Sequence, residues 1–390
     1  MHKKSSMYLV ISNLFLVFLG AGLVIPILPA LKEQMNFTGT TMGMMISIFA
    51  FAELVASPIT GALSDKYGRK KLIALGMLVF AFSQFLFGIS EVKSWFYVSR
   101  ALGGIAAAMV MPAVTAYVAD VTTLKERTKA MGIVSAAISG GFIIGPGIGG
   151  FIAQFGIRVP FYFAAILSLL GFILTLTMLK EPQRAEMHHE NDPEAISMMK
   201  ILKNPMFGAL FVIILISSFG LQAFESIYSI MSSINFGFSS GEIAMIVTVS
   251  GALALFFQLF LFDKIISRIG EIGLIQLTFF VSAIFIAAIA FTKSNLVVIF
   301  STFIVFLAFD LFRPAVTTYL SKHAGHAQGA INGLNSAFTS FGNILGPIAA
   351  GALFDFNHVF PYYVSAVILL FTGFLSLLLS KGNLNTAIKN

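Results

Sequence analysis

Two stretches of sequence, MPAVTAY at residues 111–117 and RPAVTTY at residues 313–319, are nearly identical and start 202 residues apart. A second pair, GFIIGPGIGG at 141–150 and GNILGPIAAG at 342–351, has an offset of 201 residues. A third and weaker pair, SDKYGRKK and FDKIISRIG, has an offset of 198 residues. Near-constant spacing over three separate matches predicts that the chain contains two copies of one structural unit.

The composition indicates that these copies fold in a membrane. Of the 390 residues, 57% are hydrophobic and only 11% are charged, whereas soluble domains have about 25% charged residues. This composition excludes a soluble enzyme and a disordered chain. Apolar runs long enough to cross a bilayer are expected at residues 8–31, 41–63, 72–90, 95–119, 130–153, 160–180, 204–231, 240–262, 272–291, 295–318, 329–353 and 360–380.

The positive charges predict the orientation of these spans. Of the 24 Lys and Arg residues, eighteen fall in the termini and loops of one side, and four fall on the other side: Lys32, Lys93, Arg158 and Lys293. Cytoplasmic loops carry the excess of Lys and Arg. We therefore expect a multi-pass protein of the cell membrane with both termini in the cytoplasm, and the net charge of +7 calls for no nucleic-acid partner.

The spans and the repeat together predict an all-α membrane protein with twelve transmembrane helices. Two six-helix bundles, residues 1–180 and 204–390, are expected to be related by a pseudo-two-fold axis and joined by a cytoplasmic linker at 181–203. The sequence has no Cys, its His residues fall in tails or predicted loops, and it has no phosphate-binding G-x-x-x-x-G-K-[ST] motif. We therefore expect no metal and no cofactor. Nothing signals a dimer interface, so a monomer is expected.

Five charged residues are predicted within spans: Glu53, Arg100, Glu225, Asp310 and Arg313. Charges at membrane depth are costly and indicate function by default. The first two belong to the first copy and the other three to the second.

Glu225 is the best candidate for a group that takes up and releases a proton. No Lys or Arg occurs between residues 204 and 263, so no basic residue of its own helix holds it ionised. Asp310 is a second candidate, but Arg313, three residues later, is positioned on the same helix face. Asp310 and Arg313 form either a working pair or a permanently closed ion pair.

Polar residues at helical spacing form a stripe along each of three spans in the second copy, and two of these stripes include Glu225, Asp310 and Arg313. They predict either a wet cavity or interhelical hydrogen bonds that hold the bundle together. The stripes are Ser218, Gln222, Glu225 and Ser229; Asn332, Asn335, Ser336, Thr339 and Asn343; and Asp310, Arg313 and Thr317. The 42 Phe residues are mostly packing residues, although Phe142 and Phe309 are among those beside polar stripes and are candidates for the wall of a pocket.

The first copy offers two charged candidates of its own. Glu53 either attracts cationic substrates or forms a buried hydrogen bond, and the sequence favours neither. Arg100 follows a run of apolar and aromatic residues, which places it at partial depth, where it can extend towards the membrane interface.

Two motifs rich in glycine have a physical reading. In GALSDKYGRKK (61–71), Gly61 and Gly68 permit a tight turn and close helix approach, and Asp65 is positioned to cap a helix end or to pair with Arg69. In GFIIGPGIGG, the residues Gly141, Gly145 and Gly149 recur every fourth position, which lets two helix backbones touch. Pro146 removes one helical hydrogen bond.

These motifs resemble those of the major facilitator superfamily. GALSDKYGRKK is similar to the loop motif of that superfamily, and GFIIGPGIGG is similar to the Gly-Pro motif of its drug/proton antiporters. The resemblance extends along the whole chain to Gram-positive multidrug efflux pumps. It implies that the loop of Asp65 and Arg69 latches the two halves, that Arg100 serves conformational coupling, and that the acids of spans 7 and 10 carry protons. Related sequences usually have Gln where this chain has Glu53.

The function that the resemblance implies is a proton-coupled antiporter, not an enzyme. It would export hydrophobic and often cationic drugs, such as fluoroquinolones, dyes and quaternary ammonium compounds, by alternating access. Glu225 and Asp310 would couple protons. Glu53, Gln222, Phe142, Phe309, Asn335, Thr339 and Asn343 would bind substrate. Arg100, Arg313, Asp65, Arg69, Gly145 and Pro146 would serve the conformational change. The alternative is an exporter of one endogenous metabolite or polyamine that transports drugs incidentally.

Overall fold

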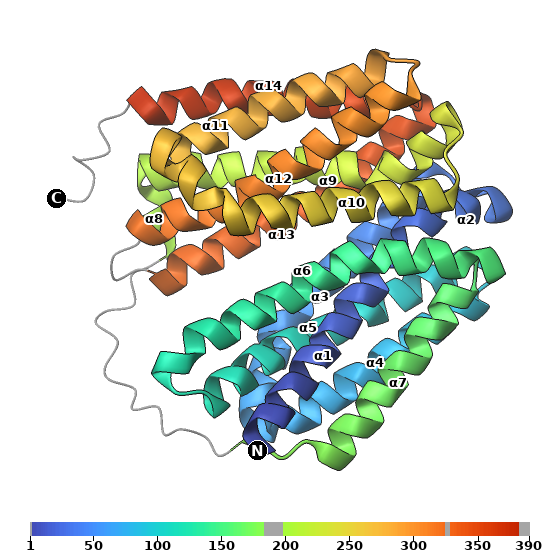
Figure 1. Ribbon diagram of the computed structural model, residues 1–390, viewed down its shortest axis with the longest axis vertical. Helices are drawn as coiled ribbons and strands as arrows, with labels where there is room; N and C mark the ends of the chain where they lie inside the picture. The colour runs from blue at the N-terminus through green and yellow to red at the C-terminus, as the bar shows by residue number, and fades with distance from the viewer. Residues whose placement is uncertain (1, 183–197, 324–327, 382–390) are drawn as a thin grey trace. The chain divides into compact units, whose positions relative to one another are not determined.

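A computed structural model describes residues 2–182, 198–323 and 328–381, and all regular structure in these ranges is helical (Figure 1). Most of the linker expected at 181–203 lies outside the described residues. In chain order the elements are α1 His2–Gly22, η1 Ile25–Ile27, α2 Leu28–Met35, α3 Gly39–Tyr67, α4 Arg69–Ile89, α5 Lys93–Val121, α6 Leu124–Ile152, η2 Ala153–Phe155, α7 Val159–Met178, α8 Met198–Lys203, α9 Pro205–Phe236, α10 Ser240–Phe260, α11 Phe262–Phe291, α12 Asn295–His323, α13 Gln328–Phe356 and α14 Phe360–Lys381.

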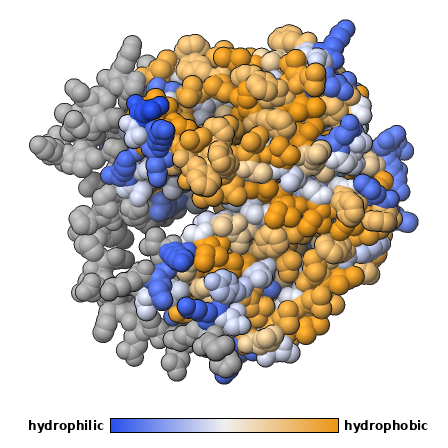
Figure 2. Space-filling view, in the orientation of Figure 1, coloured by the Kyte–Doolittle hydropathy of each residue, from blue (hydrophilic) through white to orange (hydrophobic). Residues whose placement is uncertain are grey.

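Twelve helical segments of the described chain are long and apolar enough to cross a membrane, which confirms the predicted spans. Each of the twelve predicted runs overlaps one of them. Figure 2 shows that hydrophobic residues cover the middle of the helices and that hydrophilic residues gather towards their ends. Large apolar side chains such as Phe260, Phe291 and Leu296 are more than two-thirds exposed, as expected of residues that face lipid rather than water.

Contacts divide the chain into two compact units, each described here by itself. The first unit contains residues 1–37, 44–189 and 238–248, and the second contains 38–43, 190–237 and 249–390. Each unit therefore includes the first turns of a helix whose remaining residues belong to the other unit, α3 in one case and α10 in the other. Within the second unit, the carboxylate of Asp355 at the end of α13 accepts hydrogen bonds from the backbone N–H groups of Gly39 (2.5 Å) and Thr40 (2.9 Å).

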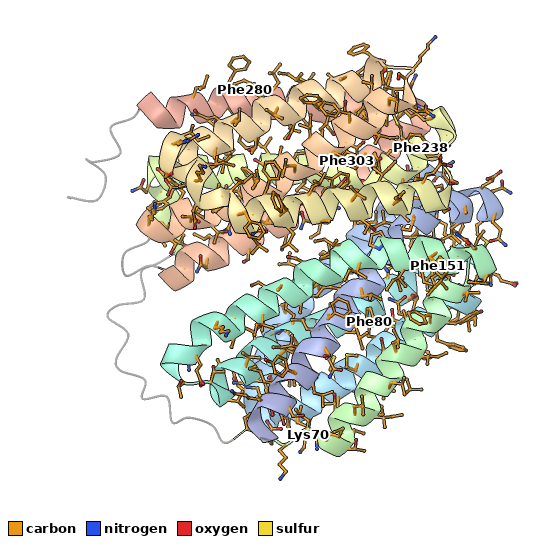
Figure 3. All side chains as sticks on the ribbon, in the orientation of Figure 1. Lys70, Phe80, Phe151, Phe238, Phe280 and Phe303 are labelled. Carbon is orange, nitrogen blue, oxygen red and sulfur yellow. The ribbon has the colours of Figure 1, made fainter. Side chains whose placement is uncertain are left out.

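The core of the first unit forms where α1 packs against α4, α5, α6 and α7. Val10, Leu14 and Phe80 are buried there, and Figure 3 shows Phe80 between the helices of this unit. A Cβ atom on Gly20 of α1 would lie only 2.8 Å from the Phe80 ring. Because Gly20 has no side chain, the Phe80 ring can pack directly against α1. Small residues allow such close packing between membrane helices.

The two copies predicted from the repeat have matching local structure. Pro112 in α5 and Pro314 in α12 are each the twentieth residue of a helix of 29 residues. Gly68, which precedes α4, has φ +101°, and Gly270, 202 residues later in α11, has φ +70°. Glycine is the residue that adopts such backbone angles without strain, so the same turn recurs at the same place in each copy.

Candidate functional site

The second unit brings its three charged span residues together. Glu225 on α9 and Asp310 on α12 are both half-buried, and Arg313 is exposed. The charge of Arg313 acts on both carboxylates, and the charge of Asp310 acts on Glu225 as well. Residues of two helices that are 85 positions apart in sequence, Glu225 and Asp310, thus contribute to one electrostatic cluster.

Asp310 and Arg313 do not form a closed ion pair in the described part of the chain, whose ion pairs include Arg69–Asp65, Arg69–Asp120 and Lys322–Glu271. The interpretation of Asp310 and Arg313 as a permanent pair is therefore wrong for this structure. Their separation by three residues allows contact on a helix, but these two described side chains form no ion pair, and Arg313 is exposed. The carboxylate of Glu225 likewise has no hydrogen bond or ion pair within the described ranges.

Aromatic rings surround the backbone next to Glu225. The ring of Phe224 lies 5.7 Å from Tyr228, 6.1 Å from Phe309 and 5.2 Å from Tyr362, measured between centroids. Phe306 contacts both Phe224 and Tyr228. Edge-to-face packing of this kind stabilises a rigid cluster. Phe309 is only 5% exposed, so it packs inside the unit in this structure, whereas Phe142 of the first unit is 44% exposed.

The polar stripes of α9 and α13 lie on helices that touch. A Cβ atom on Gly342 would lie 2.5 Å from Ser218, and one on Gly346 would lie 3.2 Å from Gln222. These two glycines let the backbones approach closely. Gln222, Asn335, Thr339 and Asn343 are half-buried. The side-chain oxygen of Asn343 is buried without a hydrogen-bond partner. The polar groups of the stripes are therefore not all engaged in hydrogen bonds between helices.

Arg100 of α5 is buried, with 8% of its surface exposed. Its guanidinium lies 4.6 Å from the ring centroid of Phe49 and 6.0 Å from that of Phe87. Arg100 is therefore packed inside the unit, and its extension towards the membrane interface stays a prediction. Stacking on aromatic faces compensates part of the cost of burying the charge.

Glu53 lies on α3 one turn after Phe49, where α3 approaches Gly104 of α5 closely. A Cβ atom on Gly104 would lie 2.2 Å from the carbonyl oxygen of Phe49 and 3.0 Å from the backbone nitrogen of Glu53. Glu53 is half-buried, and in the described ranges its carboxylate has no hydrogen bond. The structural reading of Glu53 as a buried hydrogen-bonding group is therefore not supported here.

The glycines of α6 pack against the backbone of α1, as the spacing predicts. Cβ atoms on Gly141, Gly145 and Gly149 would lie 2.8, 2.7 and 2.6 Å from backbone oxygens of α1 and the turn that follows it. Pro146 contacts the same segment, because a Cβ atom on Gly22 would lie 3.0 Å from its ring. This helix pair belongs to the first unit alone.

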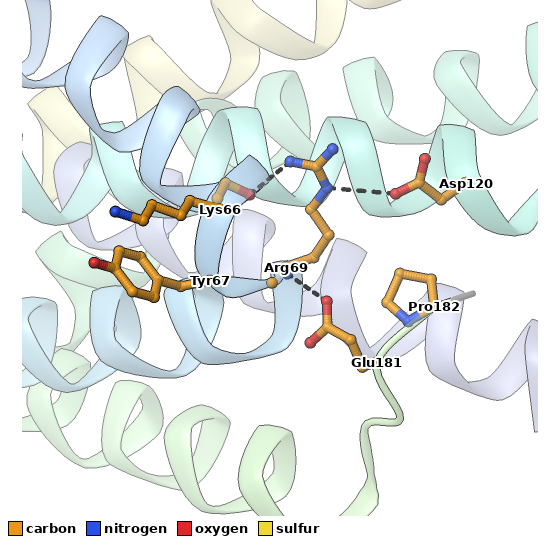
Figure 4. A pocket seen from close by; sticks show the side chains of 8 residues that line it. Lys66, Tyr67, Arg69, Asp120, Glu181 and Pro182 are labelled. Carbon is orange, nitrogen blue, oxygen red and sulfur yellow. Dashed lines mark hydrogen bonds and ion pairs between the residues drawn. The ribbon is translucent and has the colours of Figure 1, made fainter. Parts of the chain in front are cut away.

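The loop between α3 and α4 contains a network centred on Arg69 (Figure 4). Its guanidinium lies 2.5 Å from Asp65 and 3.3 Å from Asp120 of α5. The predicted pairing of Asp65 with Arg69 is confirmed, and the side chain of Asp65 is 67% exposed. Gly61 lies inside α3 with nothing within 4 Å of a Cβ position, so the close approach expected there is wrong.

The carboxylate that caps a helix end here belongs to Glu181, which the sequence did not single out. It accepts hydrogen bonds from the backbone N–H groups of Arg69 (2.5 Å) and Lys70 (3.0 Å) at the start of α4. Its place just after the sixth span, in the stretch predicted to be a linker, gave no sign of this contact. Anions are stabilised at helix N-termini.

An ion pair of opposite polarity occupies the equivalent place in the second copy. Glu271 follows Gly270 as Arg69 follows Gly68, and it pairs with Lys322 of α12. Lys322 lies 202 residues after Asp120, the same offset that separates Glu271 from Arg69. The contact is retained in both copies while the charges are exchanged.

Comparison with known proteins identifies the class to which this arrangement belongs. The chain matches the Major Facilitator Superfamily over residues 10–334 and 210–386. The chain belongs to this superfamily and is a membrane transporter, not an enzyme. The expected fold of twelve transmembrane helices in two six-helix bundles is thereby confirmed.

Two bacterial resistance proteins are similar to this chain over nearly its full length. "Multidrug resistance protein 2" of Bacillus subtilis (strain 168) is 45% identical, over 95% of this chain and 92% of the relative. "Quinolone resistance protein NorA" of Staphylococcus aureus is 37% identical, over 90% of this chain and 91% of the relative.

Solved structures show the same fold at low sequence identity. A bacterial homologue of the human lysosomal transporter Spinster, in an inward-facing conformation, has a TM-score of 0.81 and 16% identity over 97% of each chain. The nucleoside transporter NupG has a TM-score of 0.77 and 16% identity, covering 96% of this chain and 98% of that one.

Proposed function

We propose that this transporter is a multidrug efflux antiporter that exports hydrophobic, often cationic compounds in exchange for protons. Fluoroquinolones, dyes and quaternary ammonium compounds are the expected cargo. The names and identities of the relatives from B. subtilis and S. aureus support this proposal. So do the half-buried acids of α3, α9 and α12, since a carboxylate away from water attracts a lipophilic cation.

The observation that carries proton coupling is the state of Glu225. Its carboxylate is half-buried and, among the described residues, is engaged by no hydrogen bond or ion pair. A buried acid without a fixed partner can exist in both protonation states near the working pH. A proton arriving from outside neutralises Glu225 or Asp310, and the neutral site binds a cationic drug less tightly.

Exchange follows because drug and proton compete for the same negative charge. Drug leaves to the outside as the proton binds, and the proton leaves to the cytoplasm when the carrier faces inward. The membrane potential contributes about 2.3 kcal/mol per elementary charge per 100 mV. Arg313, three residues after Asp310 on α12, supplies a positive charge near the two acids in this cycle.

The remaining candidate residues fall into two groups. Glu53, Gln222, Phe142, Asn335, Thr339 and Asn343 contact substrate, and Phe309 supports the wall from behind in the conformation of this structure. Asp65, Arg69, Arg100, Gly145 and Pro146 govern the change of conformation. The first group has unpaired polar or exposed aromatic surface, and the second is engaged in contacts within its own unit.

The proposed setting is the cell membrane, with both termini in the cytoplasm and the monomer as the working form. The asymmetry of Lys and Arg along the sequence supports this orientation.

The experiment is drug transport by purified protein in liposomes with an imposed pH gradient. Wild-type protein should accumulate a cationic dye against its gradient, and Glu225→Gln should abolish that accumulation, because the amide cannot release a proton. Drug binding by Glu225→Gln should be weaker and independent of pH between 5.5 and 8.5.

Glu91→Gln is the matched control, since Glu91 is an exposed acid outside the spans and should leave transport unchanged. Normal gradient-driven transport by Glu225→Gln would remove this residue from the mechanism. Transport of one metabolite or polyamine, with no response to drugs, would instead support a dedicated exporter.

A further inference from the structure

Unpaired hydroxyl groups are concentrated in the interior of the second unit. Ten side-chain N and O atoms of the described residues are buried without a hydrogen-bond partner, and five of them belong to α9 and α14: the hydroxyls of Tyr228, Ser229, Ser232, Tyr362 and Ser365. Each of these five residues is at most 1% exposed. Buried polar groups in proteins are almost always paired with protein or with ordered water, so this concentration needs an explanation.

These hydroxyls belong to helices that pack together. The ring of Phe224 on α9 lies 5.2 Å from the ring of Tyr362 on α14. The phenol of Tyr228 interacts with the hydroxyls of Ser232 and Thr302 without a bond of proper geometry to either. Thr302 of α12 donates its own proton to the carbonyl of Val298 at 2.7 Å, which leaves its oxygen free to accept.

The hydroxyl cluster, defined as Tyr228, Ser229, Ser232, Thr302, Tyr362 and Ser365, lies along one direction from Glu225. On α9, Ser229 and Ser232 follow Glu225 by four and seven residues and share its helix face. At about 1.5 Å per residue, Ser232 is roughly 10 Å further along the helix. α9 ends at Phe236 and α14 begins at Phe360, so the cluster extends from Glu225 towards the end of the unit that faces outside in the proposed orientation.

We propose that the hydroxyl cluster binds a file of water molecules that conducts protons between Glu225 and the outer end of the second unit. Buried waters typically make about three hydrogen bonds to otherwise unpaired groups, and hydroxyls both donate and accept. A proton enters the file from external water, each water passes one proton to the next, and the last proton bonds to the Glu225 carboxylate. No other covalent bond changes.

This inference rests on the proposed function, because it gives the entry route of the proton that Glu225 exchanges. It assigns a role to tyrosines that the transport site itself does not need. Tyr228 and Tyr362 are positioning residues for water, since their hydroxyls do not touch Glu225 in this structure. Their rings hold the aromatic cluster together, and phenylalanine would keep that packing.

The test uses Tyr228→Phe, Tyr362→Phe and the double variant in the full-length protein. Each removes a hydroxyl and keeps the ring. We expect proton-driven dye efflux by the double variant to fall about tenfold or more, while the Kd for the dye stays within twofold of wild type. The solvent deuterium isotope effect on efflux should increase, because proton delivery becomes rate-limiting.

Tyr363→Phe is the matched control. It is the next residue of α14, its ring pairs with Phe291 at 5.1 Å, and its hydroxyl is not part of the cluster. Its efflux rate and isotope effect should equal those of wild type. Ser232→Ala provides a second variant should the double tyrosine variant fail to fold, and it should slow efflux in the same way.

Water itself is detected by radiolytic hydroxyl-radical labelling with pulsed X-rays, which modifies side chains beside bound water. Tyr228 and Tyr362 should be labelled although both are fully buried. Absence of label at both, or a wild-type rate and isotope effect in the double variant, would overturn the water file. Absence of dye transport driven by a pH gradient in the wild-type protein would instead overturn the proposed function, so the two failures are distinguishable.

Discussion

Glu181 provides the most direct test of how the loop between α3 and α4 is held. Its carboxylate accepts hydrogen bonds from the backbone N–H groups of Arg69 and Lys70. The residue before α4, Gly68, has no side chain with which to cap the helix. A side-chain cap is worth about 0.5–2 kcal/mol, and a negative charge at a helix N-terminus adds about 0.3–1 kcal/mol. Glu181→Ala should therefore destabilise the first turn of α4 by about 1–3 kcal/mol.

Hydrogen–deuterium exchange measures this loss at the amides concerned. Since 1.4 kcal/mol corresponds to a factor of ten, exchange at Arg69 and Lys70 should accelerate by roughly 5- to 150-fold. Glu181→Gln, which keeps one accepting oxygen, should show an intermediate effect. Glu126→Ala is the control, because Glu126 bonds only to Thr123 at the start of α6. Wild-type exchange rates at both amides in Glu181→Ala would refute the capping of α4 by this residue.

Three further predictions follow from the loop, the topology and the glycine packing. Asp65→Asn should express normally, because Asp65 is 67% exposed and solvent limits the ion pair with Arg69 to about 1 kcal/mol, yet turnover in liposomes should slow with drug affinity unchanged; a large loss of affinity would contradict this. Single Cys residues at Lys70 and Lys293 should react with impermeant maleimide from opposite sides of the membrane, and labelling of both from outside intact cells would disprove the orientation. Gly145→Val should lower thermal stability sharply, since its Cβ would meet the Leu19 carbonyl at 2.7 Å, whereas Gly132→Ala, with open space around it, should not.

The fold could be predicted from sequence because it depends on long signals. Each span is an apolar run of about twenty residues, and the segments around Pro112 and Pro314 are nearly identical in sequence. The contact between α6 and α1 was also predictable, because glycines at every fourth position have one plain steric use. These features are set by the order of residues along one helix.

Features that depend on contacts across the chain were not predictable. Glu181 reaches the start of α4 from more than a hundred residues away, and no local pattern marks it. The sequence did not predict that the rings of Phe49 and Phe87 pack against the guanidinium of Arg100. Arg313 and Asp310 have the spacing of a pair and do not form one, since side-chain rotamers rather than spacing decide contact. The sequence analysis did not single out Tyr228 and Tyr362, because no local pattern shows that their hydroxyls are buried.

The reversed ion pairs Arg69–Asp120 and Glu271–Lys322 carry a record of how the two copies diverged after duplication. If one ancestral pair occupied this place, a single replacement would have set two like charges against each other, so the change of sign required both positions to change before the intermediate was lost. In this chain an ion pair joins the helix start to the helix after it in both copies, irrespective of which partner is acidic. Ancestral reconstruction of these four positions should therefore pass through a neutral pair, and a chain carrying uncharged partners at both places should still fold.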